Sequence, residues 1–116
     1  MGIFRRRTRD AADHSVAIVV DDEGARRLYR GETTHRVSWA DLERVALRTT
    51  DDGPYAEDLF WVLVGGRGTG FVIPSSLVPD GMLARLQELP GFDNEAVLQA
   101  MQSVTENVFV AWRKPE

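Results

Sequence analysis

One segment restricts the possible folds of this chain more than any other. Residues 59–64 read Leu-Phe-Trp-Val-Leu-Val and are apolar throughout, which is typical of a strand that is central in a sheet or buried on both faces. Four glycines follow within residues 65–70, and glycine adopts the positive φ of a tight turn without steric cost. Residues 71–74 predict the returning strand. The chain should therefore contain a β-hairpin within an antiparallel sheet.

The residues before this hairpin alternate between strand and turn signals. Their β-branched and apolar content predicts a meander of strands. These strands are expected at 15–20, 25–30 and 33–37, with a further strand at 44–50. Residues 38–41 read Ser-Trp-Ala-Asp and match a capping box, in which Ser38 accepts a hydrogen bond from the Asp41 N–H. We therefore expect a short helical turn at 39–43.

Two helices are predicted after residue 79, because apolar residues recur there at helical spacing. Asp80 is expected to cap the first helix, and Asp93 or Asn94 to cap the second. The apolar stripes consist of Met82, Leu83, Leu86 and Leu89 in the first helix and Ala96, Val97, Ala100, Met101 and Val104 in the second. A final strand at 108–112 must return to the sheet to bury its aromatic residues.

Together these elements predict an α+β fold. We expect an antiparallel sheet of about six or seven strands, with the two C-terminal helices packed on one face and covering residues 59–64. Residues 1–14 are expected to be a disordered basic lead-in, and residues 15–116 a single domain. The predicted core consists of Val16, Ile18, Val20, Trp39, Leu42, Val45, Leu47, Phe60, Val62, Val64, Phe71, Ile73, Leu83, Leu86, Val97, Met101, Phe109 and Trp112.

The composition is that of a globular protein and excludes several kinds of chemistry. Apolar residues make up 43% of the 116 positions and charged residues 28%, and no apolar run reaches the ~20 residues of a membrane-spanning helix. No cysteine is present, so disulfides, thiol catalysis and thiolate metal sites are excluded. The basic start leads directly into polar sequence, without the apolar stretch of a secretory signal. We therefore expect a cytoplasmic protein.

The net charge of −4 is distributed unevenly along the chain. Residues 1–10 hold four arginines and one aspartate, whereas the remaining residues carry a net charge of −7. Because an acidic body repels phosphate backbones, we expect no nucleic-acid partner, and a basic protein surface is the better complement. The basic tip, with Ile3 and Phe4, is expected to be a solvated terminus; membrane contact through it is an alternative hypothesis.

Residues 51–58 form the densest cluster of oxygen ligands in the sequence. Their spacing does not match the calcium loop of an EF-hand, and nothing in the sequence requires a second acidic segment to lie near them. We therefore expect no metal site. Trp112 would anchor a partner if its place near the chain end left it exposed. The acidic and aromatic side chains of the loop are the main candidate partner-binding residues. They are Asp51, Asp52, Tyr55, Glu57 and Asp58.

No other motif indicates catalysis or a cofactor. The glycines at 65–70 lie between two strands and lack the lysine of a phosphate-binding loop. Ser75 and Ser76 lack the flanking glycines of a nucleophile elbow. His14 and His35 are the only histidines, and neither has metal-ligand spacing or a neighbouring nucleophile. We therefore predict no catalytic, cofactor-binding or metal-binding residue.

Several separated segments resemble a family of small uncharacterised bacterial proteins. The resemblance lies in residues 37–42 (Val-Ser-Trp-Ala-Asp-Leu), 49–55 (Thr-Thr-Asp-Asp-Gly-Pro-Tyr), 57–63 (Glu-Asp-Leu-Phe-Trp-Val-Leu) and 86–97 (Leu-Gln-Glu-Leu-Pro-Gly-Phe-Asp-Asn-Glu-Ala-Val). It implies no activity. The meander followed by a Trp-x-Asp-Leu turn is also similar to bacterial pleckstrin-like domains. Those domains end in a helix, whereas this chain is predicted to end in a strand, so the similarity bears on fold more than on function.

Three hypotheses of function remain open. The first is a non-enzymatic protein-binding module of the bacterial cytoplasm, of the immunity or adaptor type, that meets its partner through the acidic loop. The second is a small enzyme or small-molecule-binding protein with a pocket between sheet and helices. Such a pocket would need a polar cluster drawn from Asp41, Arg48, Tyr55 and Asp58. The third is a peripheral membrane protein attached through its basic N-terminus.

Overall fold

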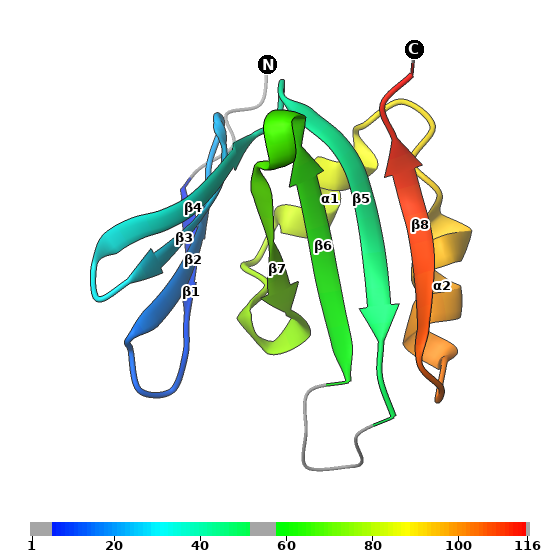
Figure 1. Ribbon diagram of the computed structural model, residues 1–116, viewed down its shortest axis with the longest axis horizontal. Helices are drawn as coiled ribbons and strands as arrows, with labels where there is room; N and C mark the ends of the chain where they lie inside the picture. The colour runs from blue at the N-terminus through cyan, green and yellow to red at the C-terminus, as the bar shows by residue number, and fades with distance from the viewer. Residues whose placement is uncertain (1–5, 52–57, 116) are drawn as a thin grey trace.

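The computed structural model describes residues 6–51 and 58–115. Within them the chain forms two four-stranded antiparallel sheets and two α-helices (Figure 1). The strands are β1 (Arg7–Asp10), β2 (Val16–Val20), β3 (Gly24–Tyr29), β4 (Glu32–Ser38), β5 (Leu42–Thr49), β6 (Leu59–Gly65), β7 (Gly70–Pro74) and β8 (Asn107–Arg113), and the helices are α1 (Met82–Gln87) and α2 (Asn94–Gln102). The predicted α+β class is confirmed, with eight described strands in two sheets in place of one sheet of six or seven.

The first sheet has the strand order β1-β2-β3-β4. Residues 1–14 were expected to be a disordered lead-in. Within them, Arg7–Asp10 instead forms the outermost strand of this sheet and pairs antiparallel with Val16–Val20. The turn between β2 and β3 is held by Asp21, whose Oδ1 accepts from the N–H groups of Glu23 and Gly24. Gly24 is required there because a Cβ would collide with the backbone of β4.

The second sheet has the order β7-β6-β5-β8. β6 is central, as predicted, and β8 returns to pair with β5. The predicted helical turn at 39–43 is wrong: residues 39–41 form a turn and β5 begins at Leu42. The Ser38 Oγ does accept from the Asp41 N–H at 3.1 Å, but the chain leaves the turn as a strand because Val45 and Leu47, both fully buried, bring it into the sheet.

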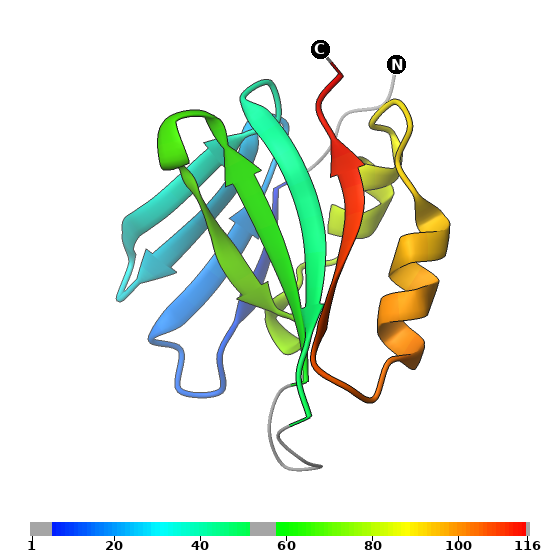
Figure 2. The same cartoon turned by 45° about the vertical axis from the view of Figure 1, so that its right-hand side comes forward.

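The core lies between the two sheets and the helices. α2 packs against β8 and β5, so it covers these strands more than it covers β6 (Figure 2). Most predicted core residues are buried or pack against the buried cluster. The prediction that Met101 belongs to the core is wrong, because 56% of its surface is exposed. The same prediction is wrong for Phe60, Val62 and Val64. Trp61 and Leu63 face the interior in their place.

Of the two predicted helix caps, one is confirmed and the other is wrong. Asp93 caps α2, accepting from the Ala96 N–H at 3.2 Å. Asp80 does not cap α1, which begins after Gly81 in the left-handed region at φ 88° without a side-chain cap. Trp112 is buried rather than exposed, and its Nε1 donates to the Pro90 carbonyl at 2.9 Å. In the described part of the chain, neither helix has the length and apolar character that crossing a membrane requires.

Candidate docking face of the second sheet

The two faces of the second sheet have different surroundings. The helices lie behind one face, whereas no described helix or strand lies in front of the other (Figures 1 and 2). Because side chains alternate along a strand, the register of the four strands determines which residues share this second face. We call it the open face and define it by three rows of residues that run across β8, β5, β6 and β7.

The middle row is entirely apolar. Ala46 pairs with Val110 on one side and with Val62 on the other, and Val62 pairs with Val72. The Val72 side chain is 48% exposed, whereas Val62 and Val110 are half-buried. Aliphatic side chains therefore cross all four strands on the outer side of the sheet, although Ala46, at 2% exposure, contributes almost no accessible surface.

The rows on either side combine apolar residues with arginines. One row consists of Val108, Arg48, Phe60 and Pro74, and the other of Arg113, Arg44, Val64 and Gly70. Val108 is 59% exposed, and all three arginines are exposed. A one-sided antiparallel sheet normally carries polar residues on its solvent face. On the open face the arginines are the only polar residues in the three rows.

The apolar run of β6 explains how the face forms. Trp61 and Leu63 are buried against the core, so Phe60, Val62 and Val64 must point the other way. A strand that is apolar on both faces is typical of a sheet covered on both sides. Here the described residues cover only one side, which leaves a contiguous apolar patch of the kind that marks an interaction surface.

The arginines of the open face differ in their partners. Arg48 lies 3.6 Å from the Glu106 carboxylate, and both side chains are more than half exposed. Arg44 and Arg113 are direct cross-strand neighbours, and neither forms an ion pair with a described residue. They line a hollow at the end of the sheet together with Asp41, Glu43, Val64, Lys114 and Pro115.

The predicted partner-binding loop lies mostly outside the described residues, which include neither Asp52, Tyr55 nor Glu57. Asp51 and Asp58 are exposed at the end of the sheet where β5 is followed by β6. The Asp58 carbonyl accepts from the Thr50 N–H at 3.0 Å, one position beyond the last β5–β6 pair. These two aspartates therefore adjoin the Arg48 row of the open face.

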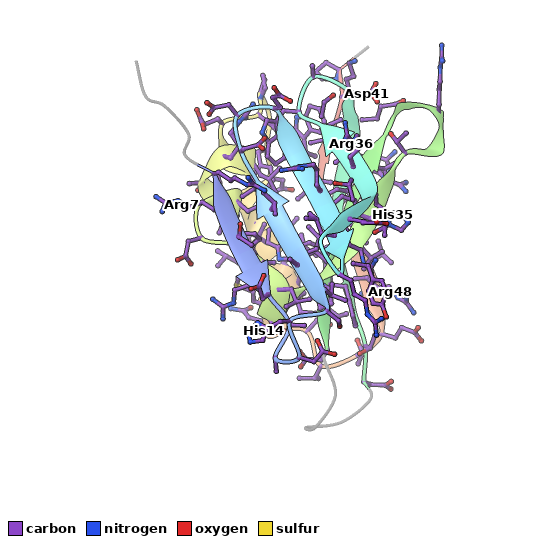
Figure 3. The ribbon with its side chains drawn as sticks, turned by 90° about the vertical axis from the view of Figure 1, so that its left-hand side faces the viewer. Arg7, His14, His35, Arg36, Asp41 and Arg48 are labelled. Carbon is purple, nitrogen blue, oxygen red and sulfur yellow. The ribbon has the colours of Figure 1, made fainter. Side chains whose placement is uncertain are left out.

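The polar cluster that a pocket between sheet and helices would need is not brought together. Asp41 and Arg48 lie near opposite ends of β5, well apart in Figure 3, Asp58 is at the Arg48 end, and Tyr55 is outside the described residues. The hollow beside Arg44 has no lining residue from either helix. The same holds for a second hollow, on the first sheet, where Arg26 lies 3.8 Å from Asp21.

The two histidines lie far from each other (Figure 3). His14 is in the β1–β2 turn at φ 61°, with Nδ1 3.7 Å from Asp10. In the same turn, hydrogen bonds from the Ser15 backbone and hydroxyl hold the pKa of Asp13 below its usual value. His35 is exposed on β4 and its ring is tilted at 6.1 Å from that of Phe71. Across the described ranges, no three histidine, aspartate or glutamate side chains are grouped to hold a metal ion.

Comparisons with models of protein families, with curated proteins and with solved structures find no match to this chain. The open face was not predicted from the sequence, because Phe60 and Val62 were expected in the core and no pattern singled out Val72 or Val108. One signal was present: Arg44 and Arg48 are four residues apart in a strand, so they share a face.

Proposed function

We propose that this protein is a non-enzymatic protein-binding module of the bacterial cytoplasm, of the immunity or adaptor type, and that the open face receives its partner. The observation that carries the proposal is the apolar middle row with Phe60, Val64 and Val108 beside it, uncovered by any described element. Apolar residues grouped on an uncovered sheet face and rimmed by charged side chains are typical of an interaction site.

The size of the face fits the centre of an interface. Four strands spaced by about 4.8 Å and three rows spaced by two residues give a face of about 14 by 13 Å, with the apolar middle row at its centre. A stable interface buries roughly 800 Å² on each partner, with an apolar centre and a polar rim. The open face would supply the centre, and the exposed arginines together with Asp51 and Asp58 would supply part of the rim.

Partner recovery with matched surface variants tests the proposal. The tagged full-length protein is expressed in its native host as the wild type, as Val72→Gln and as Leu98→Gln. Leu98 is the matched control because it is 53% exposed, close to the 48% of Val72, but lies on α2. Val72 is the most exposed residue of the middle row and would be buried by a partner on the open face. We therefore expect Val72→Gln to lower partner recovery by about tenfold or more.

The control decides how the result is interpreted. Leu98→Gln should recover the partner as the wild type does, and circular dichroism should show the same fold for all three proteins. Equal recovery by Val72→Gln and the wild type would exclude the open face as the docking surface. A matching loss with Leu98→Gln would show that the effect is not specific to the open face and would count against the assignment.

A further inference from the structure

We propose that the partner of this protein is acidic where it meets the open face, with carboxylates on either side of an apolar ridge. This inference rests on the proposed protein-binding function and specifies the chemistry of the partner. It is opposite to the expectation from net charge, which predicts a basic partner for a chain of −4. The charges at the interface itself, rather than the total, determine which partner surface is complementary.

The distribution of charge on the open face carries the inference. The three rows contain Arg44, Arg48 and Arg113 and no aspartate or glutamate. The nearby carboxylates lie outside the rows, at the two ends of the sheet: Asp41 and Glu43 beyond the Arg44 row, and Asp51, Asp58 and Glu106 beyond the Arg48 row. A partner that covers the apolar middle row must therefore approach three guanidinium groups, and burying them without carboxylates would be strongly unfavourable.

The pair formed by Arg44 and Arg113 is the position where a partner carboxylate fits best. Like charges directly opposite each other across two strands destabilise a sheet, and these two arginines face the same hollow with Lys114 beside them. Asp41 and Glu43 also line this hollow but form no ion pair with Arg44 or Arg113. A partner carboxylate between the two guanidinium groups would relieve their repulsion and accept hydrogen bonds from both.

Arg48 marks the second position. It lies four residues from Arg44 on β5, which corresponds to about 13 Å along an extended strand. Its ion pair with Glu106 is long and solvent-exposed, so a partner carboxylate can replace Glu106 at little cost. The partner surface should therefore carry two acidic groups about 13 Å apart, with apolar side chains between them that pack on the middle row.

A second copy of the chain does not satisfy these requirements. Two open faces in contact are related by a two-fold axis that lies in the plane between them. If the axis is parallel to the strands, Arg44 of one copy faces the Arg44 row of the other. If it is perpendicular to the strands, Arg44 and Arg113 face the row that contains Arg48. Either arrangement brings arginines together without a carboxylate in the rows.

Site-specific photocrosslinking in the native host tests the chemistry of the partner. A diazirine analogue of leucine is placed at Val108 on the rim of the open face, and in a control protein at Leu98 on α2. The crosslinked peptide is identified by mass spectrometry. We expect a peptide of another protein in which aspartate or glutamate residues flank apolar ones, and no such adduct from position 98.

The same readout is repeated with charge-reversed variants. Arg44→Glu should lower the yield of the adduct at position 108 by about tenfold or more. Arg36→Glu is the matched control, because Arg36 is an exposed strand arginine that also pairs directly with another arginine, Arg26, but on the first sheet. The control should leave the yield within about twofold of the original, since surface charges far from a contact are screened.

The possible outcomes separate this inference from the proposed function. A crosslinked peptide of a basic or neutral protein, a peptide of this same chain or a lipid adduct would overturn the acidic partner. An unchanged yield with Arg44→Glu would overturn it as well. The basic or neutral protein would leave the proposed function standing. The complete absence of an adduct at position 108 would contradict the proposed function itself.

Discussion

At the scale of single residues, Thr49 shows how the second sheet is closed at one end. It is the buried polar residue within the described core, with 1% of its surface exposed. Its Oγ1 donates to the Thr105 carbonyl at 2.6 Å and lies 3.3 Å from the Ser103 Oγ. These contacts attach the segment after α2 to the end of β5, where β8 begins.

Replacing Thr49 with valine should therefore destabilise the protein, although the two side chains have nearly the same shape. The substitution removes the hydrogen bond to the Thr105 carbonyl, which still accepts from the Ser103 Oγ at 3.1 Å, so we expect a loss of about 0.5–1.5 kcal/mol in the free energy of unfolding. Thr33→Val on the exposed surface of β4 is the control and should change it by less than ~0.5 kcal/mol. Urea denaturation followed by circular dichroism measures both; equal values would contradict this role of Thr49.

At the scale of secondary-structure elements, the helix caps provide a paired test. Asp93→Ala removes the side chain that accepts from the Ala96 N–H at the start of α2, and we expect it to lower the free energy of unfolding by about 1 kcal/mol. Asp80→Ala should have an effect within ~0.5 kcal/mol, because Asp80 is exposed and caps nothing. Thermal or urea denaturation distinguishes the two. A larger effect at Asp80 than at Asp93 would show that the caps are assigned incorrectly.

The same elements show which features the sequence could predict. β-Branched and apolar patterns identified the strands from β2 to β8, and the glycines identified the turn of the central hairpin. β1 was not identified, because Arg-Thr-Arg-Asp contains no apolar residue. It forms as an edge strand whose backbone pairs with β2 while all its side chains remain exposed.

β6 also explains why the candidate site could not be predicted. When every residue of a strand is apolar, the alternation that distinguishes the inner face from the outer face is absent. The sequence pattern therefore could not determine whether Phe60, Val62 and Val64 or the residues alternating with them face the core. The second sheet contributes Trp61 and Leu63 to the core instead, and only the tertiary structure determines this orientation.

At the scale of the whole molecule, the two sheets and two helices share one buried cluster. Trp39 joins the sheets: it is 6% exposed, and its Nε1 donates to the Asp21 carbonyl at 2.7 Å. Some apolar residues outside this core, among them Val72 and Val108, lie on one face with three arginines, although the chain as a whole is acidic. Other exposed apolar residues lie elsewhere, on β3, on α2 and just after α2. Composition predicts the net charge correctly but not where the unpaired charge lies, because that depends on strand register.

The proposed docking function requires that the outer side of the second sheet be uncovered in the free protein. Methyl NMR of the full-length protein with a soluble paramagnetic probe tests it directly. The methyl signals of Val72 and Val108 should be broadened strongly, whereas those of Leu47 and Leu63, each at most 1% exposed, should be nearly unaffected. Protection of the Val72 and Val108 methyl groups to the level of Leu63 would show that the face is covered and would contradict its assignment as an open docking surface.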